Sequence, residues 1–75
     1  MDFAIILTTV SAVEEGQSIA KILVEKQLAA CINIIPKISS VYRWEGKVHS
    51  ESEILLLIKT TKGLEAAVYK EVQAV

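Results

Sequence analysis

The chain has 75 residues, 52% of them hydrophobic, and its mean hydropathy is +0.43. Eight basic residues against nine acidic ones give a net charge of -1, which argues against the cationic field that binding to nucleic acid or acidic lipid requires. A domain this small has a thin core, so we expect other subunits to cover part of its apolar surface.

The cellular compartment follows from one cysteine and a short apolar N-terminus. Cys31 has no partner for an internal disulfide, which favours a reducing compartment. The apolar run near the N-terminus lacks basic residues before it and is too short for a signal peptide or a membrane span. We therefore predict a cytoplasmic protein with no membrane partner.

The first half of the chain predicts a strand and a helix. Residues 3–7 are nearly all apolar, as expected of a central strand covered on both faces. Ser11 and Glu14 have the spacing of a capping box, in which two side chains bond free amides at a helix start. Apolar residues then recur at helical spacing to about Gln27, which predicts an amphipathic helix.

The second half predicts a long hairpin and a last helix. A strand begins near Ala29 and bends at Pro36, since proline cannot donate to a β-ladder. The Glu45-Gly46 pair predicts a two-residue turn. That turn places three pairs of residues opposite each other: Trp44 and Lys47, Tyr42 and His49, and Arg43 and Val48.

After the turn, the returning strand is predicted to be buried over residues 54–58. Thr60 or Thr61 then caps a helix with an apolar stripe. The stripe consists of Leu64, Ala67, Val68, Val72 and Val75.

The order strand, helix, strand, strand, helix predicts an α+β, ferredoxin-like fold with both helices on one face of an antiparallel sheet. We assign one domain to residues 1–75 and expect it to be incomplete at its C-terminal end, because the last apolar stripe is still in phase at Val75. The fourth strand of such a fold is missing, and we expect something to cover the free edge of residues 3–7.

No catalytic constellation is visible, and we assign no catalytic, cofactor-binding or metal residue. Cys31 is interpreted as a small buried hydrophobe rather than a soft ligand. His49, Glu51 and Glu53 share one strand face, where solvated side chains are the simpler interpretation and a divalent cation is the alternative.

Two other features have competing interpretations. Tyr42 and Trp44 share a face near the hairpin tip and are predicted to contact another subunit, the alternative being that they cover their own sheet. Residues 59–62, KTTK, stand at a helix start, where an anion site is a weaker interpretation than a capped helix.

The run LAACINIIPKISSVYRWEGKVHSESEILLLIKT, preceded by TTV and a helix ending LVEKQ, resembles the divalent-cation tolerance (CutA) family. The resemblance covers nearly the whole chain. It implies a small cytoplasmic protein of ferredoxin-like fold, a tight homotrimer joined edge to edge through the long hairpin, and no assigned enzymatic reaction.

The resemblance also implies copper or another divalent cation as a ligand. The ligands proposed in the family are a first-strand cysteine, where Thr8 stands here, and histidines that would fall beyond Val75. The site therefore does not carry over residue by residue.

The resemblance implies a non-enzymatic homotrimer linked to the tolerance of, or response to, divalent metal ions such as copper. The alternative is a small regulatory protein of the same trimeric fold that senses a ligand or a nucleotide, since fold alone does not determine function.

Overall fold

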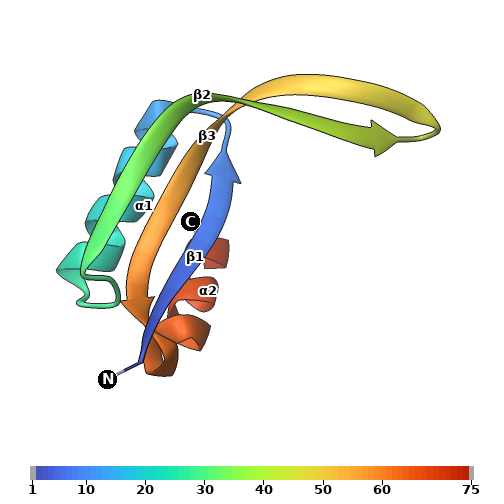
Figure 1. The fold of residues 1–75 in the computed structure, drawn as a ribbon. Coiled ribbons are helices and arrows are strands. Elements are labelled where there is room, and N and C mark those ends of the chain that lie inside the picture. Colours follow the sequence, from blue (N-terminus) through green and yellow to red (C-terminus); the bar gives the residue numbers. More distant parts are fainter. Residues whose placement is uncertain (1, 75) are drawn as a thin grey trace.

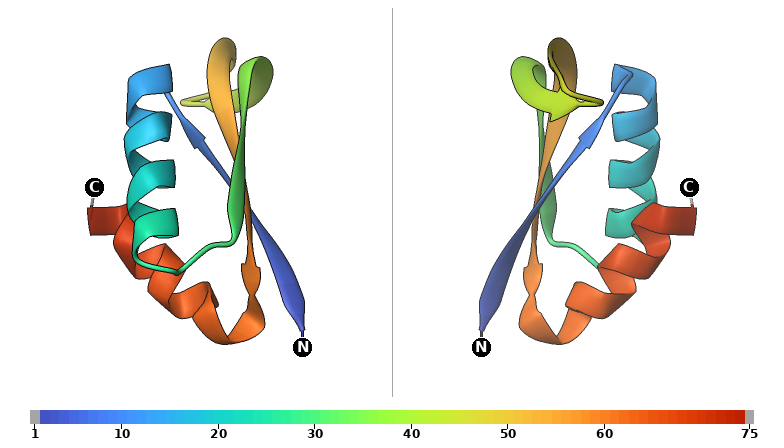
Figure 2. Two further views of the ribbon diagram at one scale, coloured as in Figure 1. Left: turned by 90° about the vertical axis from the view of Figure 1, so that its left-hand side faces the viewer. Right: turned by 90° about the vertical axis from the view of Figure 1, so that its right-hand side faces the viewer.

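The protein is a two-layer α+β domain, seen here in a computed structural model that describes residues 2–74. The sheet has three strands, and both helices lie on one side of it (Figures 1 and 2). The elements are β1 (Phe3–Val10), α1 (Val13–Glu25), β2 (Cys31–Trp44), β3 (Lys47–Thr61), the 3-10 turn η1 (Lys62–Leu64) and α2 (Glu65–Ala74). The predicted order and the placement of the helices are confirmed.

The sheet has the antiparallel order β1-β3-β2, so β3 is its central strand. The prediction that residues 3–7 form a central strand covered on both faces is wrong for the described chain. β1 is bonded on one side only, to β3, and alternate side chains of β1 face away from the helices. An unbroken apolar run hides this alternation, because the outward positions are as apolar as the inward ones.

The core lies between the sheet and the helices. Its fully buried side chains come from all three parts of the fold: Leu23 of α1, Leu56 and Ile58 of β3, and Val68 of α2. Burial of the 54–58 segment is confirmed on this face, while Leu55 and Leu57 are only half-buried on the other. The predicted stripe of α2 also faces the core at Val68, and Val75 lies outside the described residues.

The start of α1 differs from the predicted capping box. Ala12 is the N-cap residue and makes no side-chain cap. Ser11 instead donates its backbone amide to Glu15 Oε1 at 3.4 Å, so the neighbouring glutamate, and not Glu14, reaches back to the helix start.

The end of α1 is a Schellman motif. The helix ends at Glu25, and Gln27 adopts the left-handed conformation with φ of 59°. The amides of Gln27 and Leu28 donate to the carbonyls of Val24 and Leu23 at 3.0 and 2.9 Å. This turn occupies the residues predicted to end the helix and begin the strand, so β2 starts at Cys31 instead of Ala29.

The predicted cap at Thr60 or Thr61 is half right. Thr61 occupies the N-cap position of η1, but its side chain makes no cap hydrogen bond. The buried Thr60 donates its hydroxyl to the Leu28 carbonyl at 2.6 Å and so joins the end of β3 to the loop after α1. The prediction of a buried Cys31 is wrong, because its side chain is exposed on the face away from the helices.

Candidate functional site

The main candidate is the hairpin formed by β2 and β3, whose outer half projects beyond the helices (Figure 1). Glu45 and Gly46 both have positive φ, 51° and 76°, as a tight two-residue hairpin turn requires. All three predicted pairs around the turn are confirmed by the strand register. The long axis of the molecule is 42 Å, against 23 and 20 Å for the other two.

The bend at Pro36 is a β-bulge. It determines on which side of the ribbon each side chain of the outer part of β2 lies. Ile35 pairs with Leu55 and Ile38 with Glu53, so β2 carries one residue more than β3 across this interval. Lys37 takes up the extra length with φ of 59°. Beyond the bulge, even-numbered side chains of β2 therefore lie on the side of the ribbon away from the helices.

Tyr42 stands at the centre of a polar cluster on that side. Its ring stacks on His49, with centroids 5.4 Å apart and the planes inclined by 16°. Its hydroxyl donates to Glu51 Oε1 at 2.6 Å, and Ser40 donates to Glu53 Oε2 at 2.8 Å. The hydrogen bond to Glu51 raises the pKa of the Tyr42 phenol above 10.0, and desolvation and the charges of Glu51 and Glu53 act in the same direction.

Trp44 lies two pairs closer to the turn on the same side of the ribbon, and it is 63% exposed. Tyr42 is 38% exposed. On the opposite side of the ribbon, Val41 and Val48 are also exposed. Trp44 therefore does not cover the sheet of its own chain, and the hairpin tip presents apolar side chains on both sides.

A second apolar surface, which we call the open sheet face, lies on the side of the sheet away from the helices. Figure 2 shows that neither helix covers this side. Phe3 is 76% exposed there, and Ile5 and Leu7 are each 62% exposed. The surface consists of Phe3, Ile5, Leu7, Ile35, Leu55 and Leu57. Sequence reasoning did not locate this surface, although the composition had indicated more apolar surface than one small domain can bury.

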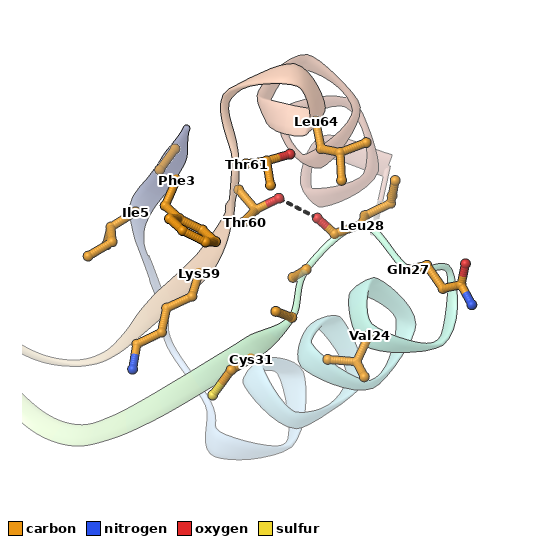
Figure 3. A pocket seen from close by; sticks show the side chains of 13 residues that line it. Phe3, Ile5, Val24, Gln27, Leu28, Cys31, Lys59, Thr60, Thr61 and Leu64 are labelled. Atoms are coloured by element: carbon orange, nitrogen blue, oxygen red, sulfur yellow. Dashed lines mark hydrogen bonds between the residues drawn. The ribbon is translucent and has the colours of Figure 1, made fainter. Parts of the chain in front are cut away.

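A cavity of about 620 Å³ lies at the end of the sheet opposite the hairpin tip. Figure 3 shows Phe3, Ile5 and Lys59 on one side of it, and Val24, Leu28 and Leu64 on the other. Cys31 and Lys59, which pair across the strands, both belong to its lining. No pattern in the sequence indicated this cavity, because its walls come from both ends of the chain and from the Schellman turn.

Over residues 4–75 the sequence matches the model of the CutA1 divalent ion tolerance protein family. The chain belongs to this family. It is 53% identical over 57 residues to the divalent-cation tolerance protein CutA of Thermus thermophilus, covering 76% of this chain and 55% of that protein. It is 48% identical over 60 residues to protein CutA of Homo sapiens, covering 80% of this chain and 34% of that protein.

Solved CutA structures share the fold. The divalent cation tolerance protein of Thermus thermophilus superposes with a TM-score of 0.89 at 44% identity, covering 99% of this chain and 71% of that one. CutA of Xylella fastidiosa gives 0.93 at 35% identity, with the same coverage. The ferredoxin-like fold is confirmed. The chain spans about half or less of the length of the curated CutA relatives described above.

The described residues do not fit the copper centre that the CutA resemblance implied. Thr8 lies on the helix side of β1, paired with Leu56, and its neutral hydroxyl is a poor ligand for copper. Residues 2–74 contain no group of three or more His, Cys, Asp or Glu side chains arranged to hold a metal ion. Glu51 and Glu53, the carboxylates of the alternative site, each accept a hydrogen bond from β2.

The location of CutA proteins varies among the relatives. One Arabidopsis thaliana relative, 47% identical over 70 residues, is named chloroplastic, and the Archaeoglobus fulgidus structure is named periplasmic. In the part of this chain that the structure describes, no helix is long and apolar enough to cross a membrane.

Proposed function

We propose that this chain works as a homotrimeric, non-enzymatic CutA protein in the response to divalent metal ions. Family membership supports the link to metal tolerance. The main observation in favour of assembly is the projecting hairpin, which exposes Trp44 near its tip. A large aromatic side chain held away from the core of its own chain is typical of a contact with another chain.

The open sheet face supports the same proposal. Three apolar β1 side chains, Phe3, Ile5 and Leu7, stand exposed on one continuous surface, an arrangement that monomeric proteins rarely leave in water. We propose that the hairpin and the open sheet face both meet other copies of the chain. A cytoplasmic location remains a prediction from the single cysteine.

Sedimentation equilibrium tests the assembly. We expect the wild-type protein to sediment as a trimer and Trp44→Ala to weaken association by about 2 kcal/mol, as for a contact anchor. Tyr69→Ala is the matched control, because Tyr69 is an exposed aromatic on α2, away from the hairpin. A monomeric wild type, or equal association of the two variants, would contradict the proposed contact.

Calorimetric titration with Cu²⁺ tests the metal part. We expect no submicromolar site in the 75-residue chain, because Thr8 replaces the cysteine and the hairpin carboxylates already have partners. A submicromolar site that disappears in Cys31→Ser or His49→Ala would show that these residues do bind copper, contrary to our assignment.

A further inference from the structure

The β-bulge lies where the three-stranded part of the sheet ends. Val10, the last residue of β1, pairs with Ile54 of β3, and Pro36 and Lys37 of β2 lie opposite that same Ile54. Beyond this point β3 pairs with β2 alone within the described chain, and the hairpin turns away from the base of the sheet (Figure 1). We call the part of the hairpin beyond the bulge, residues 38–53, the arm. The bulge is therefore the joint between the packed domain and the arm.

Packing fixes the domain side of this joint. Ile54 is 8% exposed and belongs to the buried core. Gly16 of α1 lies so close that a Cβ atom there would be 3.4 Å from Val10 Cγ2 and 4.0 Å from Ile54 Cγ2. A bulge bends its strand and increases the local twist. Because the residue opposite the bulge is held between β1 and the start of α1, that bend changes the direction of the arm and not the domain.

Two diagonal hydrogen bonds stiffen the arm. Ser40 pairs with Glu51 across the strands but donates its hydroxyl to Glu53 at 2.8 Å. Tyr42 pairs with His49 but donates its hydroxyl to Glu51 at 2.6 Å. Each donor therefore reaches two residues back toward the bulge, to a diagonal neighbour on the same face. These bonds tie successive pairs of the arm together from the bulge as far as Tyr42.

A regular ladder could replace the bulge, which makes its strain informative. Lys37 has φ of 59°, in the left-handed region that lysine rarely adopts. The Lys59 carbonyl accepts from the Ala30 amide, so odd-numbered residues of β3 turn their backbone groups toward β2, and Ile54 turns its groups away. Without Lys37, Pro36 would lie opposite Ile54 at a position that needs no amide donor. A strained conformation kept under these conditions points to a role outside the single chain.

We propose that the bulge at Pro36 and Lys37 positions the arm for assembly, because its bend directs the tip toward another copy of the chain. This inference rests on the proposed homotrimer, in which the hairpin meets other copies. The two bulge residues act through the direction of the arm, while Trp44 near the tip makes the contact. An arm without the bulge keeps its cross-strand pairs and both of its surfaces but points elsewhere.

Deletion of Lys37 tests the proposal, since it removes the bend and leaves the pairs of the arm unchanged. We expect an unchanged far-ultraviolet circular dichroism spectrum, measured at a dilution where the wild type is also dissociated. Association should be weaker by roughly 10-fold or more in sedimentation equilibrium, as for the loss of a contact anchor. Lys37→Gly is the matched control, because glycine adopts a positive φ readily, keeps the bulge and should assemble like the wild type.

A double-mutant cycle shows whether the bulge acts through the tip. Trp44→Ala should weaken association in the otherwise wild-type chain and add little in the deletion variant, because the tip no longer reaches its partner there. A bulge with a merely structural role would leave the effect of Trp44→Ala the same in both backgrounds.

The outcomes separate this inference from the homotrimer on which it rests. A monomeric wild type would overturn both. A wild-type trimer with equal association of the deletion variant would overturn the positioning role alone. Deletion of Pro36 in place of Lys37 removes the same bulge, and loss of the folded spectrum in both deletions would show that the bulge serves the fold of the single chain, contrary to the proposal.

Discussion

At the level of single residues, Tyr42 is the best-defined group on the hairpin. It stacks on His49 across the strands and donates a hydrogen bond to Glu51, two residues further along β3. The hydrogen bond needs the phenol to be neutral, because its hydroxyl is the donor. The two contacts hold together a part of the hairpin that has no helix behind it.

The ionisation of Tyr42 should report on this contact. Its pKa is raised in the folded chain, so the stabilisation is fully present below the ordinary value of 10.0 and is lost as pH rises through the folded pKa. In a Tyr69→Phe background, which leaves one tyrosine, we expect Tyr42 to titrate above 10.0 by absorbance and Glu51→Gln to lower the midpoint. An unchanged midpoint in Glu51→Gln would show that the hydrogen bond does not form in solution.

Cys31 shows the limit of reasoning from residue type. A lone cysteine is among the most often buried residues, which supported a buried position here. Its actual exposure depends on which face of the sheet the first residue of β2 occupies, and that depends on where the Schellman turn ends. The turn itself needs Gln27 in the left-handed conformation. Glycine or asparagine is the usual residue at that position, so a glutamine does not predict the turn.

At the level of elements, β1 combines two different environments in one apolar run. Ile6 faces the helices and is 7% exposed, while its neighbours Ile5 and Leu7 stand on the open sheet face. The outward residues contribute little to the fold of a single chain. Their apolar character is explained by the proposed contact between copies.

Leu7→Lys tests this division of β1. Because Leu7 is exposed in the single chain, the far-ultraviolet circular dichroism should stay unchanged, whereas a lysine buried without a partner at an interface is strongly unfavourable. We expect the variant to dissociate at concentrations where the wild type stays assembled, as measured by sedimentation velocity.

Ser18→Lys is the control for Leu7→Lys, since it adds the same charge at an exposed position of α1. If Leu7→Lys remains as well assembled as this control, the open sheet face is not a subunit contact.

For the whole molecule, local patterns were enough to predict the order of elements, the tight turn and the register around it. Gly46 and Pro36 act on their immediate neighbours, so their effects can be read along the chain. The open sheet face and the cavity were not predictable in this way. Both depend on which surfaces remain uncovered after the helices have packed, and Phe3 and Lys59 meet there from opposite ends of the sequence.

The bulge at Pro36 and Lys37 has a further consequence for how this hairpin tolerates changes in length. It shifts the alternation of β2 by one residue, which is why Tyr42 and Trp44 lie on the side away from the helices. Deleting one residue there would restore regular pairing, and because the partners in β3 stay the same, every later side chain of β2 would keep its present side. A single-residue deletion at the bulge should therefore leave the two surfaces of the arm unchanged, whereas a one-residue change elsewhere in β2 would need a new bulge to keep the register that the turn sets.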